Sequence, residues 1–144
     1  MDLASIIKAI ESGGNAHAIR FEPHAYAGWA WTPTFDRIVA KHHCSLGTGR
    51  MIACTSWGVY QFMGVNVFDP AYAGQVDPIN VFAFVADADM QDKLFGVFLK
   101  HKGIDFTPAE LLADAGKMTK FVTEWNGPAN VDGYAALIRS RAAG

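Results

Sequence analysis

The sequence predicts a predominantly α-helical α+β fold, and two observations support this. From Ser56 onward, apolar residues recur at helical spacing in one segment after another. Between residues 15 and 55 the chain is instead rich in Gly, Pro, His and aromatic residues and has no sustained helical period. The 144 residues can bury one proper core, and no repeat or linker divides them, so we expect a single domain over residues 1–144 with a small β region.

The first helix is predicted just before the glycine pair at residues 13–14, which ends it. Its apolar face consists of Leu3, Ile6, Ile7 and Ile10. Asp2 can cap its first turn. Glu11 then falls in the last turn beside the apolar face, where the negative end of the helix dipole and apolar neighbours disfavour its charged form. Such a carboxyl is suited to general acid catalysis, but the position alone favours an exposed glutamate without a function.

Two short strands are predicted for the β region, at residues 19–22 and 51–54. A short helical pattern around Phe35 and Ile38 lies between them. Residues 57–63 are expected to form a crowded short helix or turn. The β region is therefore expected to be small and to contain loops.

Helix-start signals divide the second half of the chain. Asp77-Pro78 predicts one helix start, because Pro is favoured at the first helical position. Thr107 and Glu110 form a capping box that predicts another. The apolar faces of these helices are Val81, Phe82 and Val85; Met90, Leu94, Val97 and Phe98; Leu111 and Leu112; Met118, Phe121, Val122 and Trp125; and Tyr134, Leu137 and Ile138.

Composition excludes several classes of function. The hydrophobic fraction of 51% and the charged fraction of 18% indicate a globular protein. The formal net charge of −2 does not suggest a nucleic-acid binder, which would normally show a basic patch. No apolar run is long enough to span a bilayer, so no membrane insertion is expected, and the first residues lack the basic and apolar regions of a signal peptide.

The two cysteines, Cys44 and Cys54, are expected to remain thiols in a reducing cytosol. They are close enough in sequence for a disulfide formed after release, and this alternative stays open. His42 and His43 directly precede Cys44, but adjacent histidines are poorly placed to face one ion. We therefore expect no metal site.

Three short patches stand out, at residues 11–14, 56–64 and 124–128, and the second and third combine aromatic rings with an amide side chain. Aromatic rings can stack on the apolar face of a pyranose, and Asn and Gln amides can bond its hydroxyl and acetamido groups. Together the patches predict a glycan-binding cleft. The candidate substrate-binding residues are Ser12, Ser56, Tyr60, Gln61, Trp125 and Asn126. Ser12 can also orient Glu11, and Ser56 can hydrogen-bond carboxylates of the cleft.

The same patches, in this order, resemble the lysozyme-like superfamily of goose-type lysozymes and lytic transglycosylases. The most similar family is the N-acetylmuramidase domain of phage endolysins, which also resembles this chain at Phe21-Glu22-x-His24. The similarity spans nearly the whole chain and implies a lysozyme-like fold with Glu11 as the catalytic acid. The family more often has a tyrosine where Trp125 stands.

The resemblance implies hydrolysis of the β-1,4 bond between N-acetylmuramic acid and N-acetylglucosamine, without a cofactor. Because such hydrolysis usually uses two carboxyl groups, Glu22 is the candidate partner of Glu11. An ion pair of Glu22 with Arg20 or His24 is the alternative. Lytic transglycosylases use a single glutamate and release 1,6-anhydro products, so that activity also stays open.

Two further alternatives remain at this stage. The chain could be a non-catalytic module that binds peptidoglycan or chitin, or a chitinase-like enzyme of the same superfamily. The expected partner is the glycan strand of peptidoglycan, bound by a monomer. The expected setting is phage lysis: the protein collects in the host cytoplasm until a holin releases it to the cell wall.

Overall fold

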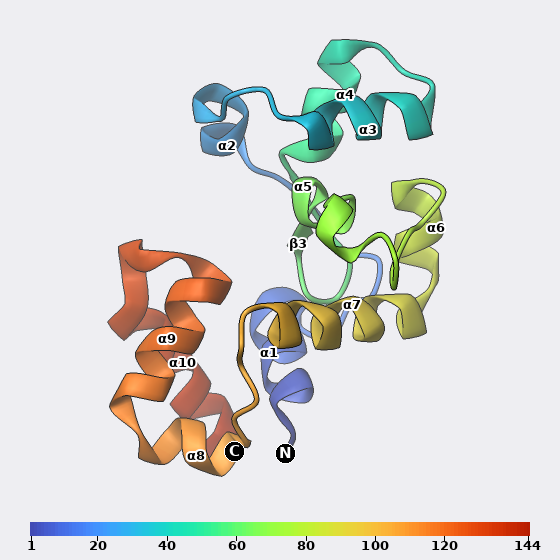
Figure 1. Cartoon of the computed structure of the whole chain (residues 1–144). Coiled ribbons are helices and arrows are strands. Elements are labelled where there is room, and N and C mark those ends of the chain that lie inside the picture. Colours follow the sequence, from blue (N-terminus) through green and yellow to red (C-terminus); the bar gives the residue numbers. More distant parts are fainter.

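The computed structural model describes residues 1–144 and confirms the predicted fold class, with many helices and one small sheet. The elements are α1 (Leu3–Ser12), β1 (Ile19–Phe21), α2 (Pro23–Gly28), α3 (Pro33–His42), α4 (Leu46–Ala53), β2 (Thr55–Trp57), β3 (Phe62–Met63), α5 (Gly64–Val67), η1 (Pro70–Tyr72), α6 (Val81–Ala86), α7 (Ala88–His101), α8 (Pro108–Ala113), α9 (Ala115–Asn126), η2 (Pro128–Asn130) and α10 (Val131–Ala143). Figure 1 shows α2, α3 and α4 at the top of the view and α8, α9 and α10 at the lower left, with α1 and α7 between them.

Helix α1 forms as its sequence pattern predicts. The side chain of Asp2 accepts a hydrogen bond of 2.7 Å from the backbone N–H of Ser5. Gly13 ends the helix in the left-handed conformation, at φ 64°. Helix α1 packs against α10, so the two ends of the chain close one part of the core.

The sheet has the order β1-β2-β3, and both pairs of strands are antiparallel. The strand predicted at residues 51–54 is wrong, because residues 51–53 end helix α4 and the strand follows at Thr55–Trp57. A short apolar run fits a helix or a strand equally well, and here Ser45 decides it by capping α4 through the backbone N–H of Thr48.

The helix or turn predicted over residues 57–63 is a hairpin turn between β2 and β3. Gly58 and Gln61 both have positive φ, at 80° and 53°, and these two residues reverse the chain. Ser56 and Met63 are then paired across the hairpin. This turn carries the second aromatic patch to the centre of the molecule.

The later helices follow the predicted pattern with some differences. The capping box of Thr107 and Glu110 is present. Helix α6, however, begins at Val81 with Asn80 as its cap, while Asp77 forms ion pairs with Arg37 and Lys41. Three residues assigned to apolar faces are exposed: Phe82, Leu112 and Leu137.

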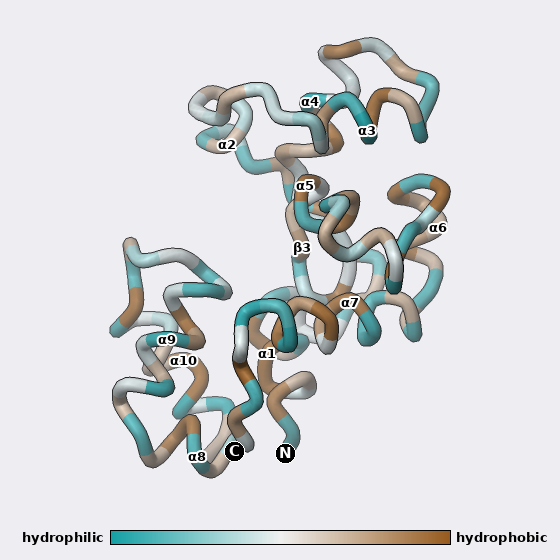
Figure 2. The backbone as a smooth tube through the Cα atoms, viewed as in Figure 1, coloured by the Kyte–Doolittle hydropathy of each residue, from teal (hydrophilic) through white to brown (hydrophobic).

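One hydrophobic core joins these elements, and α7 supplies much of it through Leu94, Phe95, Val97 and Phe98. Figure 2 shows hydrophobic and hydrophilic residues alternating along α9 and α10, as expected for helices with one buried face. None of the helices combines the length and the hydropathy needed to cross a membrane.

The histidine and cysteine cluster of the sequence is divided between structural roles. His42 accepts a hydrogen bond of 3.0 Å at Nε2 from the N–H of Val81, so its Nδ1–H donates to the carbonyl of Ile38. Both cysteines are free, and burial raises the pKa of the Cys54 thiol. No group of three or more His, Cys, Asp or Glu side chains is arranged to hold a metal ion.

Candidate functional site

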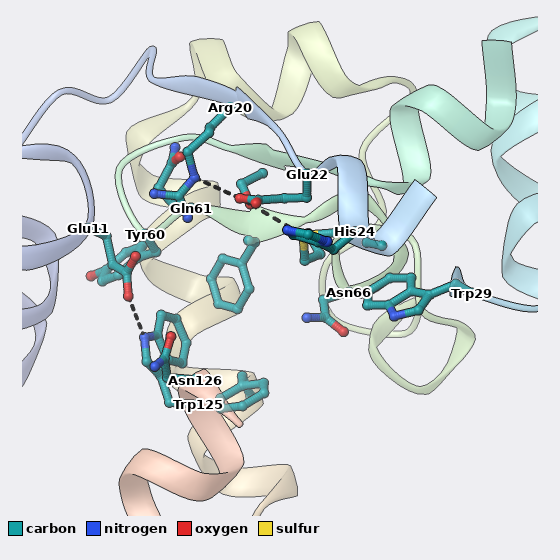
Figure 3. A pocket seen from close by; sticks show the side chains of 15 residues that line it. Glu11, Arg20, Glu22, His24, Trp29, Tyr60, Gln61, Asn66, Trp125 and Asn126 are labelled. Carbon is teal, nitrogen blue, oxygen red and sulfur yellow. Dashed lines mark hydrogen bonds and ion pairs between the residues drawn. The ribbon is translucent and has the colours of Figure 1, made fainter. Parts of the chain in front are cut away.

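A cavity of about 350 Å³ opens between α1, the sheet, α2 and the end of α9, and both candidate carboxylates line it (Figure 3). Its wall consists of Glu11, Arg20, Glu22, His24, Ala25, Trp29, Ser56, Tyr60, Gln61, Phe62, Met63, Asn66, Phe98, Trp125 and Asn126. All three sequence patches therefore contribute to one concave site.

Glu11 is held by two residues from the far end of the chain. Its Oε1 accepts a hydrogen bond of 2.9 Å from Nε1 of Trp125 and another from the hydroxyl of Tyr134. Trp125 Nε1 also lies 3.0 Å from the Tyr134 hydroxyl, so the three groups form a closed triangle. Oε2 of Glu11 accepts no hydrogen bond from the protein and is free to act in the cavity.

Tyr134 is a functional candidate that the sequence pattern did not identify. Its side chain is buried, at 6% exposure. Burial and the neighbouring Glu11 carboxylate raise the pKa of Tyr134 well above its usual range, so it stays a donor to Glu11 at physiological pH. The pattern placed Tyr134 on the apolar face of α10, and only its hydroxyl could have suggested a polar role.

Trp125 was predicted to bind substrate, and the structure shows what surrounds its ring. Its ring centroid lies 5.1 Å from that of Phe62, 5.3 Å from that of Phe95 and 5.2 Å from that of Phe98. The indole is wedged among these rings with its N–H on Glu11. This packing supports a positioning role, while stacking of a sugar on Trp125 stays a prediction.

Glu22 directly follows β1 and faces the same cavity. Its backbone N–H donates to the carbonyl of Cys54 over 2.9 Å, which fixes its place beside α4. Its Oε1 accepts hydrogen bonds of 2.7 Å from Nε of Arg20 and 2.9 Å from Oγ of Ser56. The alternative ion pair with Arg20 is therefore present, whereas His24 lines the cavity without pairing with Glu22.

The two candidate serines differ in position. Ser56 is buried at the cavity wall and holds Glu22. Ser12 does not line the cavity, and its Oγ donates to the carbonyl of Val59 over 2.8 Å. Ser12 thus connects α1 to the hairpin, which fits the expectation that it orients Glu11.

Three further candidates line the cavity and differ in the hydrogen bonds that their side chains make within the protein. Tyr60 is 1% exposed, and its hydroxyl donates to Asp92 over 2.7 Å. Gln61 uses its amide N–H₂ for the carbonyls of Ala18 and Gly58, which leaves Oε1 without a protein partner. Asn126 is exposed and its side chain has no hydrogen bond within the protein.

The sequence patches do not include Trp29 or Asn66, and His24 was considered only as an ion-pair partner of Glu22. Trp29 precedes α3 and Asn66 lies on α5, so neither falls within the three patches. The run Gly28-Trp29-Ala30-Trp31 was a usable signal, because it places two large amphipathic rings close together in the chain.

Both carboxylates share one geometry. In Glu11 and in Glu22, two donors hold Oε1 and no protein group bonds Oε2. Each side chain is therefore oriented while one oxygen remains available to a ligand. Such a pair, in a cavity with aromatic and amide groups, can donate a proton on one side and accept one on another.

Comparison with known proteins gives one informative match. No family model matches the chain, and no solved structure matches it. The endolysin of Enterobacteria phage PRD1 is 36% identical to it over 142 residues, which cover 94% of this chain and 91% of the relative. The similarity extends over nearly the full length of both proteins, and the chain therefore belongs to the endolysin family.

Proposed function

We propose that this chain degrades peptidoglycan by hydrolysing the β-1,4 bond between N-acetylmuramic acid and N-acetylglucosamine, with Glu11 as general acid. The observation that carries the proposal is the orientation of Glu11. With Oε1 held by Trp125 and Tyr134, the acidic proton belongs on Oε2, which is the oxygen free to meet the substrate.

In this mechanism Glu11 protonates the oxygen of the leaving sugar. The carboxylate that results keeps the hydrogen bonds from Trp125 and Tyr134, which stabilise the new negative charge. Because both donors are in place before the reaction, little reorganisation is needed as the bond breaks.

Glu22 is the proposed second carboxylate. Its free Oε2 could activate water or stabilise the oxocarbenium-like centre, while Arg20 and Ser56 fix the orientation of the group. Gln61 and Asn126 offer amide groups to the hydroxyl and acetamido groups of the sugars.

A lytic transglycosylase is the second candidate, and the ion pair of Glu22 with Arg20 favours it. A carboxylate engaged in this way could be purely structural, which would leave Glu11 to act alone. The sugar's own 6-hydroxyl would then attack in place of water and give a 1,6-anhydro end.

Mass spectrometry of the products from purified peptidoglycan separates the candidates. Reducing N-acetylmuramic acid ends support the hydrolase, and products lighter by one water with 1,6-anhydro ends support the transglycosylase. Retained binding to the wall without any product would contradict both and indicate a binding module. Products from chitin alone would indicate a chitinase-like enzyme.

Glu11→Gln should keep the fold and lose activity, by about 10²- to 10⁴-fold, because the amide cannot donate the acidic proton. Turbidity loss of a wall suspension measures activity, and circular dichroism measures the fold. Glu22→Gln in the same assay tests the partner role, since only the hydrolase requires a second carboxylate. Wild-type lysis by Glu11→Gln would overturn the proposal.

The proposal also includes the oligomeric state, the partners and the location of the protein. The chain acts as a monomer on glycan strands, with no nucleic-acid partner and no cofactor. It collects in the host cytoplasm, and a holin lets it reach the wall.

A further inference from the structure

Trp29, in the segment between α2 and α3, lines two hollows at once. It belongs to the wall of the main cavity and also to a second hollow of about 320 Å³. The second hollow is mostly apolar and is lined by Gly28, Trp29, Ala30, Thr32, Phe35 and Val65. The Trp29 side chain therefore forms part of the wall of both hollows.

The backbone around Trp29 is fixed by Arg50. The Arg50 guanidinium donates hydrogen bonds of 2.7 Å to the carbonyl of Trp29 and of 2.6 Å to the carbonyl of Tyr26. It also lies 5.3 Å from the centre of the Tyr26 ring. The N–H of Trp29 donates to the carbonyl of Ala25 over 3.0 Å. Trp29 is thus presented on an ordered segment, although its side chain is 40% exposed.

The indole N–H distinguishes Trp29 from the other three tryptophans. Trp31 donates to Asp36, Trp57 donates to the carbonyl of Ile52, and Trp125 donates to Glu11. The N–H of Trp29 has no acceptor within the protein. A large exposed ring with an unused donor, at the edge of a polar cavity, is suited to binding a ligand that is apolar on one face and polar at its edge.

We propose that Trp29 forms an additional saccharide-binding position, where the glycan strand continues from the main cavity and stacks an N-acetylated amino sugar on the indole. Figure 3 shows Trp29 and Asn66 on the side of the cavity away from Glu11. The Asn66 amide, which has no partner in the protein, serves the acetamido group, and the apolar hollow beside Phe35 and Val65 takes its methyl.

The inference rests on the proposed cleavage of peptidoglycan and adds to it a preference for long glycan strands. A strand long enough to reach from the carboxylates to Trp29 gains a contact that a short strand cannot make. The enzyme should therefore prefer long strands, and Trp29 should carry that preference.

The test compares Trp29→Ala with Trp31→Ala on glycan strands freed of peptides and sorted by length. Trp31 is a matched control, because it is 39% exposed, lies in the same segment and lines neither hollow. Binding is measured by calorimetry and cleavage by chromatography, with the fold of each variant checked by circular dichroism. Trp29→Phe keeps an aromatic face and should restore most of the lost affinity.

We expect Trp29→Ala to lower binding and kcat/KM on long strands about tenfold and to leave the shortest cleaved strands unaffected. Trp31→Ala should match the wild type at every length. Equal length preference in wild type and Trp29→Ala, in both assays, would overturn the inference. If the wild type cleaves nothing but binds long strands through Trp29, the proposed reaction fails while the binding position stands.

Discussion

At the scale of single residues, the hydroxyl of Tyr134 has the most direct effect on the catalytic candidate. It donates to the same oxygen of Glu11 as Trp125 and is itself buried. A positioning residue of this kind acts on the reacting group rather than on the substrate. Its loss should therefore change the rate of the chemical step more than the binding of the strand.

Tyr134→Phe should lower kcat about tenfold and leave KM nearly unchanged, because one of two donors to Glu11 is lost while the cavity keeps its shape. Steady-state kinetics on solubilised glycan strands measures both constants. Tyr72→Phe is the control, since Tyr72 is also buried but donates no hydrogen bond to Glu11. A rise in KM at constant kcat would contradict the positioning role.

The sequence predicts Glu11 and Glu22 as catalytic candidates but offers no signal for Tyr134. Glu11 has a local signal, a carboxyl in the last helical turn before two glycines. Tyr134 is separated from Glu11 by 123 positions, and its contact depends on how α1 packs against α10. Side-chain spacing reports on one element at a time, and pairs of this kind form only between elements.

At the scale of elements, the hairpin turn is held between α1 and α7. Ser12 of α1 donates a hydrogen bond to the carbonyl of Val59, and the N–H of Val59 donates one of 2.6 Å to Oε1 of Gln91 in α7. A second link runs through Asp92, which accepts from Tyr60 and pairs with Lys8 of α1 over 2.7 Å. These links set where the end of α1, and thus Glu11, lies against the cavity.

Gln91→Leu should lower the free energy of unfolding by about 2–3 kcal/mol. Gln91 is fully buried, and its amide serves the N–H of Val59 and the carbonyls of Ala16, Phe84 and Val85. Leucine removes all four of these hydrogen bonds and leaves the buried N–H of Val59 without the acceptor that Gln91 provides. Urea denaturation followed by circular dichroism measures the loss.

Gln91→Glu provides the matched comparison. It keeps the shape of the side chain and the acceptor for Val59 but turns an oxygen toward three carbonyls, so it should also destabilise the protein. Stability equal to the wild type in both variants would show that the links through Gln91 contribute nothing.

Elements with a long regular period were predicted, and short ones were not. Helices α1, α7 and α9 follow their apolar spacing closely. Helix α4 contains Gly47 and Gly49, which are poor helix formers, and it forms because Ser45 caps it and because Gly49 packs directly against Val39. Such close packing is a tertiary effect that a local pattern does not contain.

At the scale of the whole molecule, three buried tyrosines affect stability at high pH. Burial raises the pKa of Tyr60, Tyr72 and Tyr134 above the usual value of 10.0. The unfolded chain therefore loses these protons first as pH rises through about 10, and the folded state becomes less stable. Between its pKa in the unfolded chain and its higher pKa in the folded protein, each such tyrosine contributes a slope of up to about −1.4 kcal/mol per pH unit.

The free energy of unfolding should be independent of these tyrosines below about pH 9 and should fall steeply above pH 10. Urea denaturation at a series of pH values measures the slope. Tyr60→Phe should reduce the slope of the free energy of unfolding by about 1.4 kcal/mol per pH unit, because phenylalanine does not titrate. An unchanged slope in that variant would contradict the assignment.

For the molecule as a whole, the order of patches and the family resemblance predicted the helical fold and the joining of the three patches in one cavity. They did not predict the second hollow beside Trp29. That hollow depends on the packing of the α2–α3 segment against Phe35 and Val65, and no sequence spacing connects these residues.

The triangle of Glu11, Trp125 and Tyr134 also determines at which stage of protein synthesis the site can form. Translation makes Glu11 early, whereas Trp125 and Tyr134 leave the ribosome more than a hundred residues later. A nascent chain thus carries the acid without the groups that hold it. The proposed site can therefore form only after Tyr134 has been synthesised, and a chain that stops before it carries Glu11 without its two donors.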